Sequence, residues 1–511
     1  MLPIDHFINT ATKSPRKIAV IGRGFSISYG ELLAKTNALA CALQNEDPKP
    51  SSRVGICGFN TFEHLLSWLA TLAAGKVWIP LNPRNGNEEL KRIIEAVNPS
   101  IIIADNDCLK KIESNNAKII IGAELRTSKK DLLTTNFLIQ KFLGKSPDRP
   151  HLTLDDVQAI KFTGGSSGTP KGCIQTYRVW NTCIASMIVA FEFNQNDRNL
   201  LAAPMTHGTN TLIMPIFSRG GSQAIMGAAK PLNIISAFED LKPTTCFLPP
   251  TVIYMMMAEK KLKTSNLSSL KHLIIGGATM RPDEIRRGMN LFNNALETCY
   301  GQTEAPQIAM CIRSEEWLDE QNLESTGRAT ALTRVETIDT KGNILPRGVS
   351  GEIVLQGGLV MKEYFNMPEE TKATIVNGWL RTGDLGIIDD RGYVFIKDRI
   401  RDVIITGGFN VYPSDIEAVL GQHPGIKECV VFGVGDKKWG EAVHAAVELH
   451  KNVADTEEDL IRFIKNKLDS VKAPKKIHIT NSLPRSPVGK VLRREAKAYF
   501  SVLTTLTNKK I

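Results

Sequence analysis

The chain has 511 residues, with 63 Lys and Arg against 53 Asp and Glu, so its formal net charge is +10. Hydrophobic residues make up 42% of the sequence and charged residues 23%, a balance that excludes a disordered, collagen-like or coiled-coil chain. The length predicts roughly two to four compact units, and the scattered basic residues lack the interleaved aromatic residues that would favour nucleic-acid binding.

The amino-terminal segment carries Asp5 and His6 where a secretory signal needs an apolar core. The most apolar stretch, Leu65 to Ala74, is too short to cross a membrane. The nine cysteines contain no C-x-x-C pair, which argues against a disulfide framework or a zinc ribbon. We therefore expect a cytoplasmic protein without a transmembrane segment.

Helical and strand patterns alternate along the first part of the chain. Helices are predicted at Tyr29–Leu43, Phe62–Ala74 and Glu88–Val97, and strands at Arg53–Cys57, Val77–Pro80, Ile101–Ala104, Leu200–Pro204, Thr245–Leu248 and Leu273–Gly276. Strand–helix–strand alternation is typical of parallel sheets covered by helices. We expect an α/β fold whose large amino-terminal domain is built from such sheets.

The pattern changes after about residue 336. Short strands with Gly and Asp turns are predicted at Gly351–Gln356, Gly386–Asp389 and Tyr393–Ile396, which favours a small antiparallel, β-barrel-like part. A small α+β domain follows, with helices and strands predicted at Ile416–Leu420, Glu428–Val434, Ala442–Leu449 and Glu457–Leu468. We place the domains at residues 1–399 and 400–511 and expect the second to be mobile.

Residues 162–172 read Phe-Thr-Gly-Gly-Ser-Ser-Gly-Thr-Pro-Lys-Gly. Glycines lack side chains, so the backbone N–H groups of such a loop can surround a ligand, while hydroxyls and an ammonium group add further donors. A plain Gly/Ser stretch is more often a surface loop, but this ordered mixture favours a triphosphate site. Its candidate residues are Thr163, Gly164, Gly165, Ser166, Ser167, Gly168 and Lys171.

This segment resembles the phosphate-binding signature of the AMP-forming adenylating superfamily, with Gly164 where relatives usually carry Ser. The similarity covers nearly the whole chain and points to the acyl-/aryl-CoA synthetase branch. It implies that ATP converts a carboxylic acid into an acyl-adenylate with release of pyrophosphate, and that the acyl group then passes to the thiol of coenzyme A. Mg²⁺ is the implied cofactor, and ATP and CoA are the cosubstrates.

Two further segments match the family's motifs in its order. Tyr300-Gly301-Gln302-Thr303-Glu304 resembles Tyr-Gly-x-Thr-Glu, which implies that Thr303 contacts the α-phosphate and Glu304 ligates Mg²⁺. Gly277 and Ala278 fall in the segment that lines the adenine and carboxylate pocket. Taken alone, a Thr-Glu pair would more often be a helix cap.

The later motifs imply residues that bind the ribose and CoA. Asp384, in Gly378-Trp-Leu-Arg-Thr-Gly-Asp384, would accept hydrogen bonds from both ribose hydroxyls, although Thr-Gly-Asp alone more often forms a turn. Arg399 would contact the ribose, and Arg401 falls at the hinge position, where relatives usually carry Lys or Asp. Gly408 and Phe409 would border the pantetheine tunnel.

Near the carboxyl terminus, Leu483-Pro-Arg-Ser-Pro-Val-Gly-Lys490 resembles the family segment that carries the catalytic lysine. Lys490 would bridge the attacking carboxylate and the α-phosphate. A single lysine is usually a surface residue, so only the motif supports this role.

Pro204-Met-Thr-His207 resembles the segment in which a His lines the carboxylate end of the acid pocket and gates the thiol tunnel. A lone His is more often structural. No Asp lies between residues 200 and 214 to pair with an α-ammonium group, which favours a fatty or aryl acid without one. Pocket-lining residues are expected at Gly208, Thr209, Thr251, Gly277 and Ala305.

Several alternatives stay open at this point. Free CoA is favoured because the chain ends soon after Lys490, but a separate carrier protein is a second acceptor; an oxidising luciferase and a non-catalytic nucleotide-binding scaffold are further alternatives. A homodimer is neither favoured nor excluded. The basic residues near the end either hold CoA phosphates or form a solvated helix face; they are Lys472, Lys475, Lys476, Arg493, Arg494 and Lys497.

Overall fold

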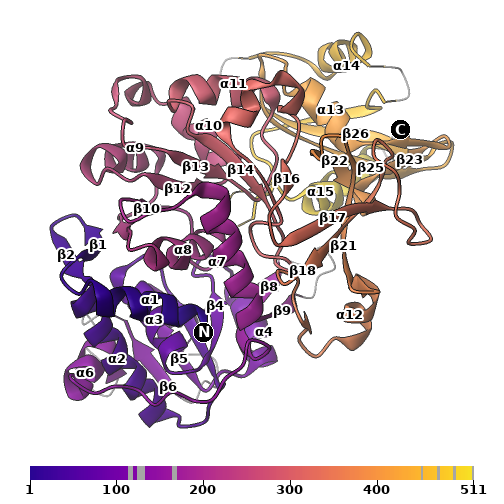
Figure 1. Cartoon of the computed structure of the whole chain (residues 1–511). Helices are drawn as coiled ribbons and strands as arrows, with labels where there is room; N and C mark the ends of the chain where they lie inside the picture. Colours follow the sequence, from indigo (N-terminus) through magenta and orange to yellow (C-terminus); the bar gives the residue numbers. More distant parts are fainter. Residues whose placement is uncertain are drawn as a thin grey trace. The chain divides into compact units, whose positions relative to one another are not determined.

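The computed structural model describes residues 1–112, 119–123, 133–163, 170–450, 453–468, 472–486, 489 and 491–508 (Figure 1). The chain divides into two compact units. Unit 1 comprises Met1–Val335 and Leu355–Leu380, and unit 2 comprises Glu336–Val354 and Arg381–Ile511. The predicted domain boundary between residues 399 and 400 marks an expected hinge, whereas these two units are defined by their compactness. The hinge therefore stays a prediction.

An eight-stranded sheet of unit 1 carries the phosphate-loop segment. Its strand order is β19-β9-β8-β4-β3-β5-β6-β7, and its strands are β3 (Arg53–Cys57), β4 (Val77–Leu81), β5 (Ile101–Ala104), β6 (Ile119–Gly122), β7 (Leu133–Thr134), β8 (Val157–Thr163), β9 (Lys171–Thr176) and β19 (Glu363–Tyr364). Strands β3 to β8 pair in parallel. β9 runs antiparallel to β8, and β19 to β9.

A nine-stranded sheet forms the rest of the framework of unit 1. Its order is β16-β15-β14-β13-β12-β10-β11-β1-β2, and its strands are β1 (Ile18–Gly22), β2 (Phe25–Ser28), β10 (Arg198–Leu201), β11 (Ser222–Ile225), β12 (Thr245–Leu248), β13 (His272–Ile275), β14 (Leu296–Tyr300), β15 (Met310–Ile312) and β16 (Arg328–Ala329). Its central pairs are parallel and its edges antiparallel, so the prediction of mostly parallel sheets is confirmed.

Helices connect and cover the strands of unit 1. They are α1 (Pro3–Lys13), α2 (Tyr29–Glu46), α3 (Phe62–Ala73), α4 (Asn87–Val97), α5 (Asn106–Ile112), α6 (Thr135–Phe142), α7 (Tyr177–Phe191), α8 (Ile213–Ser218), α9 (Pro231–Asp240), α10 (Pro250–Met257), α11 (Pro282–Leu291) and α12 (Pro368–Thr374). Ser28, Thr61 and Thr176 cap α2, α3 and α7 by accepting backbone N–H groups, as expected for hydroxyl side chains at helix starts. α7 packs against β8 and β9 (Figure 1).

A five-stranded sheet contains the predicted antiparallel part. It consists of β17 (Thr333–Ile338), β18 (Gly351–Gly357), β20 (Ile375–Val376), β21 (Trp379–Ile388) and β22 (Val394–Arg399). β21 is longer than predicted, because its residues alternate between half-buried and buried along its whole length. Asp384 therefore lies inside a strand, and the alternative that Thr-Gly-Asp forms a turn is wrong.

The last part of unit 2 is the predicted small α+β fold. A sheet in the order β24-β23-β26-β25, with β27 beside β26, contains β23 (Ile404–Thr406), β24 (Phe409–Val411), β25 (Ile426–Asp436), β26 (Gly440–Leu449) and β27 (Lys476–Thr480). Its helices are α13 (Pro413–Leu420), α14 (Glu457–Lys465) and α15 (Arg493–Asn508). Apolar side chains of the sheet and of α13 and α14 form one core.

Arg493, at the start of α15, joins several carboxylates of unit 2. Its guanidinium nitrogens lie 2.9 Å from both carboxylate oxygens of Glu417, 2.8 Å from Asp402 and 3.5 Å from Asp398. Burial raises the pKa of Glu417, while Arg493 acts in the opposite direction. Arg493 is therefore part of an internal charge cluster rather than a basic surface.

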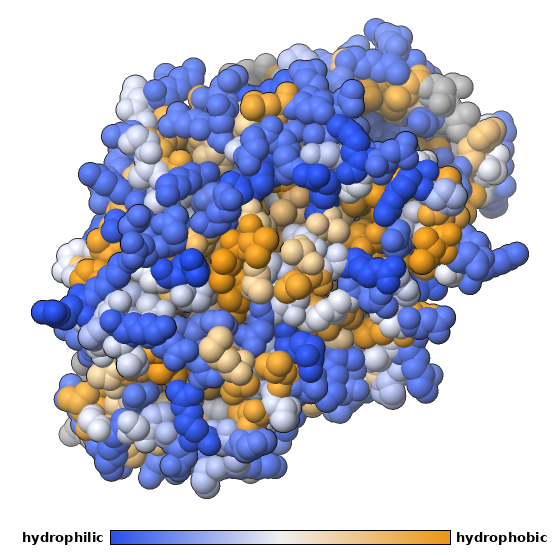
Figure 2. All heavy atoms as spheres, in the orientation of Figure 1, coloured by the Kyte–Doolittle hydropathy of each residue, from blue (hydrophilic) through white to orange (hydrophobic). Residues whose placement is uncertain are grey.

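No helix among the residues the structure describes is long and apolar enough to cross a membrane. The molecular face in Figure 2 is covered mainly by hydrophilic side chains, with apolar ones in separate patches.

We predict that Arg493→Met destabilises unit 2 by about 2–4 kcal/mol, because it leaves partly buried carboxylates without their cation. Hydrogen exchange of the α13 and β25 amides, followed in the full chain at increasing urea, measures the effect. The matched control is Lys497→Met, since Lys497 makes an exposed 3.4 Å pair with Glu441 and should cost less than about 1 kcal/mol. Equal protection in the two variants would contradict the prediction.

Candidate active site

The ends of β8 and β9 flank the phosphate-loop segment. Thr163 on β8 pairs with Lys171 on β9 across the antiparallel ladder, so both residues stand at the mouth of the loop. The Lys171 ammonium lies over the Tyr364 ring, 5.0 Å from its centroid. The other predicted members of the loop, Gly164, Gly165, Ser166, Ser167 and Gly168, lie outside the described residues, as does Lys490.

Tyr364 links this hairpin to Glu304. Its strand, β19, pairs with β9 so that Tyr364 lies opposite Cys173, and its hydroxyl donates a 2.6 Å hydrogen bond to Glu304 Oε1. Burial and the Glu304 carboxylate raise the pKa of Tyr364. No sequence motif points to Tyr364, because it lies sixty positions from Glu304 along the chain.

The segment 300–304 also joins β9. The Gln175 amide donates a 2.8 Å hydrogen bond to the carbonyl oxygen of Thr303, and Met361 N–H donates to the Glu304 carbonyl at 2.7 Å. Residues 301–309 form no helix, so the helix-cap alternative for Thr303-Glu304 is wrong. The structure thus brings Thr303 and Glu304 to the hairpin that bears Thr163 and Lys171.

The predicted acid-pocket segments meet around Phe247. A Cβ atom on Gly208 would lie 2.6 Å from the Phe247 ring and 2.8 Å from Gln307 Oε1, and one on Gly276 would lie 2.5 Å from the same ring. A Cβ atom on Gly301 would lie 2.5 Å from the Gln307 backbone. These positions require glycine, and Phe247 and Gln307 are neighbours that the sequence did not identify.

The backbone itself shapes two of the predicted ATP-binding segments. Gly277 has a φ of +84°, which side chains disfavour, and it directs the chain away from β13 toward Ala278. Gln302 and Ala305 exchange backbone hydrogen bonds of 2.9 and 3.2 Å, which close a tight turn directly after Tyr300. Both segments follow the carboxyl ends of adjacent parallel strands, where α/β sheets commonly bind ligands.

His207 precedes the short 3₁₀ helix Gly208–Leu212. Its side chain is solvent-accessible, yet protein surrounds the ring closely enough that desolvation, with smaller contributions from Lys161 and Arg84, lowers its pKa to about 4. Thr206 Oγ1 lies 2.9 Å from His207 Nδ1. The imidazole is therefore neutral at pH 7, as a non-ionic wall residue of an acid pocket would be.

The predicted ribose ligands are neighbours in unit 2. Asp384 on β21 pairs with Arg399 on β22, and the Arg399 Nε lies 2.6 Å from Asp384 Oδ1. The Asp384 side chain is 5% exposed, and an ionised carboxylate at this position can accept hydrogen bonds from two hydroxyl donors.

The predicted hinge and CoA residues also lie in unit 2. Arg401 is in the 3₁₀ turn Ile400–Asp402 between β22 and β23. Gly407 and Gly408 connect β23 to β24 with φ angles of +57° and +84°, which fits a two-residue hairpin turn. Phe409 is 60% exposed beside this turn, and its aromatic ring is available to a ligand.

The basic residues near the end do not form one exposed patch. Ion pairs engage Lys472 with Asp415, Lys476 with Glu457 and Lys497 with Glu441, and the Lys475 ammonium lies over the Trp439 ring. Arg494 is exposed. These contacts favour the interpretation as a charged surface of unit 2 over a dedicated CoA-phosphate site.

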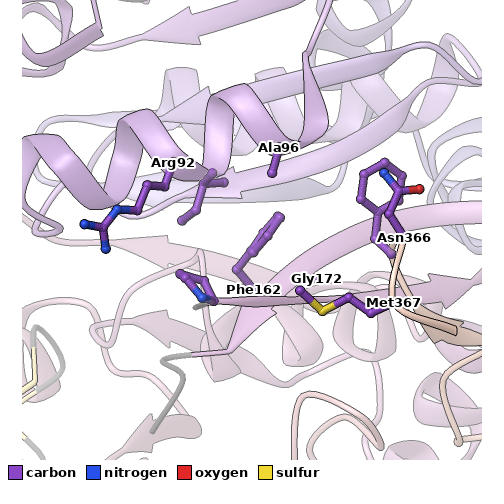
Figure 3. Close-up of a pocket in the computed structure, with 9 residues that line it drawn as sticks. Arg92, Ala96, Phe162, Gly172, Asn366 and Met367 are labelled. Carbon is purple, nitrogen blue, oxygen red and sulfur yellow. The ribbon is translucent and has the colours of Figure 1, made fainter. Parts of the chain in front are cut away.

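A pocket of about 320 Å³ lies near the phosphate-loop hairpin. Its walls come from α4, with Arg92 and Ala96, and from Phe162, Gly172 and Met367 across from it (Figure 3). Alternation along β8 and β9 places Phe162 and Gly172 on the sheet face opposite to Thr163 and Lys171. The pocket is therefore not the site that the motifs build.

The described residues hold no cluster of three or more His, Cys, Asp or Glu side chains that would bind a metal by themselves. A single carboxylate such as Glu304 nevertheless fits Mg²⁺, which is usually held by one or two carboxylates together with substrate phosphates. Tyr364 fixes one oxygen of Glu304 by its hydrogen bond and so orients the carboxylate.

Comparison with known proteins shows which family the chain resembles. The family model for the AMP-binding enzyme matches residues 7–365, and that for the AMP-binding enzyme C-terminal domain matches residues 415–490. A feruloyl-CoA synthase from Amycolatopsis sp is 31% identical over 96% of this chain and 98% of its own. A fatty acid–[acyl-carrier-protein] ligase, ScoC from Streptomyces coeruleorubidus, is 29% identical over 96% of this chain and 95% of its own.

A solved structure shows the same fold. The crystal structure of ATP-bound MatB from Rhodopseudomonas palustris superposes with a TM-score of 0.88, at 28% identity, and the match covers 98% of this chain and 99% of that one.

We predict that the His207 ring titrates with a midpoint near pH 4, because desolvation disfavours its cation. NMR of the full chain with labelled histidine measures this, and His207→Gln identifies the signal. Since the unfolded chain binds this proton near pH 6.5, the stability contribution of His207 falls as the pH drops from about 6.5 to 4. A midpoint between 6 and 7 would contradict the prediction.

Proposed function

This chain belongs to the family of AMP-binding enzymes, and from that premise we propose that it is an AMP-forming acid–thiol ligase. It activates a carboxylic acid with ATP and transfers the acyl group to coenzyme A. The observation that carries the proposal is the contact of Thr303 and Glu304 with the β8–β9 hairpin through Gln175 and Tyr364. That contact supports one site for the phosphates, their cation and the acid.

In the first step a carboxylate oxygen attacks the α-phosphorus of ATP, and the bond to the β-phosphate oxygen breaks, which releases pyrophosphate. The difficulty is repulsion between two anions, so catalysis requires positioned cations and donors. Lys171 and Thr163 stand beside the loop for the β- and γ-phosphates, and Thr303 is our candidate for the α-phosphate. Glu304 would hold Mg²⁺ together with the phosphates, and the ion would supply further charge neutralisation there.

Lys490 is the proposed catalytic residue of this step. Its ammonium would bridge the carboxylate and the α-phosphate as negative charge concentrates on the α-phosphate oxygens. Tyr300, Gly301, Gln302, Gly277 and Ala278 would enclose the adenosine. Asp384 would accept hydrogen bonds from the ribose hydroxyls, and Arg399 would donate to the ribose.

In the second step the CoA sulfur attacks the acyl carbon, the bond from that carbon to the AMP oxygen breaks, and the thiol proton leaves to solvent. We assign Gly408 and Phe409 to the pantetheine path and Arg401 to the hinge that exchanges the two steps. His207, which is neutral, would form the wall between acid and thiol.

The acid is proposed to lack an α-amino group, since residues 200–214 contain no carboxylate to pair with one. The relatives named for feruloyl-CoA and for fatty acids support aryl or fatty acids as the first candidates. ScoC is named for an acyl-carrier-protein acceptor, so transfer to a carrier protein is the second candidate function.

The reaction predicts acid-dependent exchange of labelled pyrophosphate into ATP. Purified full-length protein with Mg²⁺ should exchange label only when a suitable acid from a panel of short, medium and long fatty acids and aryl acids is present. Product analysis with CoA and with a phosphopantetheinylated carrier protein then separates the two acceptors. No exchange with any acid would overturn the proposal.

We predict that Lys490→Ala lowers the rate of adenylate formation roughly 10²–10³-fold, the typical loss of one positioned charge, and leaves thioester formation from synthetic acyl-AMP unchanged. Rapid-quench measurement of both half-reactions provides the test. Lys497→Ala is the matched control, because it removes a surface ammonium from the same end of the chain. An equal decrease in the rates of both half-reactions would contradict the assignment of Lys490 to adenylate formation.

A further inference from the structure

Lys161 is a buried lysine that none of the assignments above uses. It lies on β8, two residues before Thr163, and only 8% of its surface is exposed. Its ammonium lies over two indole rings, 5.3 Å from the Trp78 centroid and 5.6 Å from that of Trp180. Among the residues the structure describes, it has no hydrogen-bond acceptor and no carboxylate partner.

The register of the sheet places Lys161 on the active-site face. It pairs with Cys173 on β9, as Thr163 pairs with Lys171, and alternation puts these four residues on one side of the sheet. The same face carries Gln175, whose amide contacts Thr303. Lys161 also acts electrostatically on His207, whose pKa it helps to lower. Lys161 therefore lies on the same face of the sheet as Thr163 and Lys171, close enough to His207 to act on its pKa.

The neighbours of Lys161 supply no counter-charge. The titratable groups that face it are Cys173 on β9, Cys183 on α7 and His207. Burial raises the pKa of Cys183 to about 12 and that of Cys173 well above its usual value, so both are neutral thiols near pH 7. Desolvation in turn lowers the pKa of Lys161 to about 8.

A second buried lysine of unit 1, Lys76, has the hydrogen bonds expected of a structural residue. Lys76 is 1% exposed, and its ammonium donates hydrogen bonds to the carbonyl oxygens of Asp47 and Lys49 and to Ser52 Oγ. All three ammonium hydrogens thus have acceptors. Lys161 has only the faces of two aromatic rings, which compensate a desolvated ammonium incompletely.

Two tryptophan rings that contact the Lys161 ammonium belong to a cluster of three indole groups. Trp68, Trp78 and Trp180 pack with ring centroids 6.0–6.3 Å apart. Their Nε1 atoms are buried and, within the described parts of the chain, find no acceptor. Within the described residues, the groups in contact with the Lys161 ammonium include no anion, so an anionic carboxylate would complement it.

We propose that Lys161 is a carboxylate-binding residue of the acid pocket. This inference rests on the proposed function, since it names the group of the acid substrate that the ammonium meets. Two carboxylates fit the same chemistry: the one that is activated, or a second one on a dicarboxylic acid. In either case the substrate supplies the counter-charge that Lys161 lacks among the described residues.

The test compares wild type with Lys161→Met, which keeps the length of the side chain and removes its charge. Calorimetric titration with acids of the exchange panel, without ATP, should show a roughly tenfold to hundredfold weaker Kd in the variant. A straight-chain monocarboxylic acid and the dicarboxylic acid of equal length separate the two sources. If the variant binds both acids more weakly, Lys161 binds the carboxylate that is activated. If it binds only the dicarboxylic acid more weakly, Lys161 binds the second carboxylate.

Thermal unfolding supplies a readout that does not depend on activity. Lys161→Met should raise the Tm of the ligand-free protein below about pH 8, because it removes an unpaired buried cation. Between about pH 8 and 10.5 the unfolded chain binds this proton and the folded chain does not, so the advantage of the variant shrinks as the pH rises. Lys76→Met, the matched control, should lower the Tm and leave every Kd unchanged.

The pH dependence of binding gives an independent check. In wild type, acid binding should weaken above about pH 8 as the ammonium loses its proton, and this inflection should be missing in Lys161→Met. An unchanged Kd for all acids together with a lowered Tm would overturn the proposal and make Lys161 structural. Acid binding that depends on Lys161 without any pyrophosphate exchange would instead overturn the proposed function and keep this inference.

Discussion

The antiparallel pairing of β8 with β9 is the interaction on which the rest of the site depends. It brings the two ends of the phosphate-loop segment together and sets Thr163 against Lys171. The same register places Cys173 beside Tyr364 of β19, so that the Tyr364 hydroxyl reaches Glu304. A shift by one residue would turn all these side chains to the opposite face of the sheet, where α4 and the pocket around Phe162 lie.

Charge is distributed over the site in two different ways. Two of the predicted site carboxylates have partners in the chain, since Arg399 pairs with Asp384 and the Tyr364 hydroxyl donates a hydrogen bond to Glu304. The two lysines of the β8–β9 hairpin differ from these carboxylates: among the described residues, Lys161 has no anionic partner, and the Lys171 ammonium lies over the Tyr364 ring. This division follows from the cost of burying an uncompensated charge: a partner inside the chain would compete with the substrate for the same cation.

The sequence predicted most elements closely, because hydrophobic periodicity and turn residues act locally. Strands β3, β5 and β12 begin and end where the pattern placed them, and the order of motifs led to the family. It placed the start of one strand too late, at Gly386, whereas β21 begins at Trp379. The Thr-Gly-Asp tripeptide has turn composition, yet cross-strand pairing with β22 keeps Asp384 inside β21, because pairing with a neighbouring strand outweighs local preference.

The sequence by itself therefore determined the order of strands and helices, the parallel-sheet class and the residue types that suit a nucleotide and an acid. Only the tertiary structure decided which of these residues meet. Tyr364 reaches Glu304 and Phe247 closes on Gly208 and Gly276 across long stretches of chain, and Arg493 joins three carboxylates that precede it by more than seventy positions. The physical reason is that hydrophobic periodicity indicates whether a side chain is buried. Which residue a buried side chain contacts depends instead on how distant segments pack, as the contacts of Lys161 show.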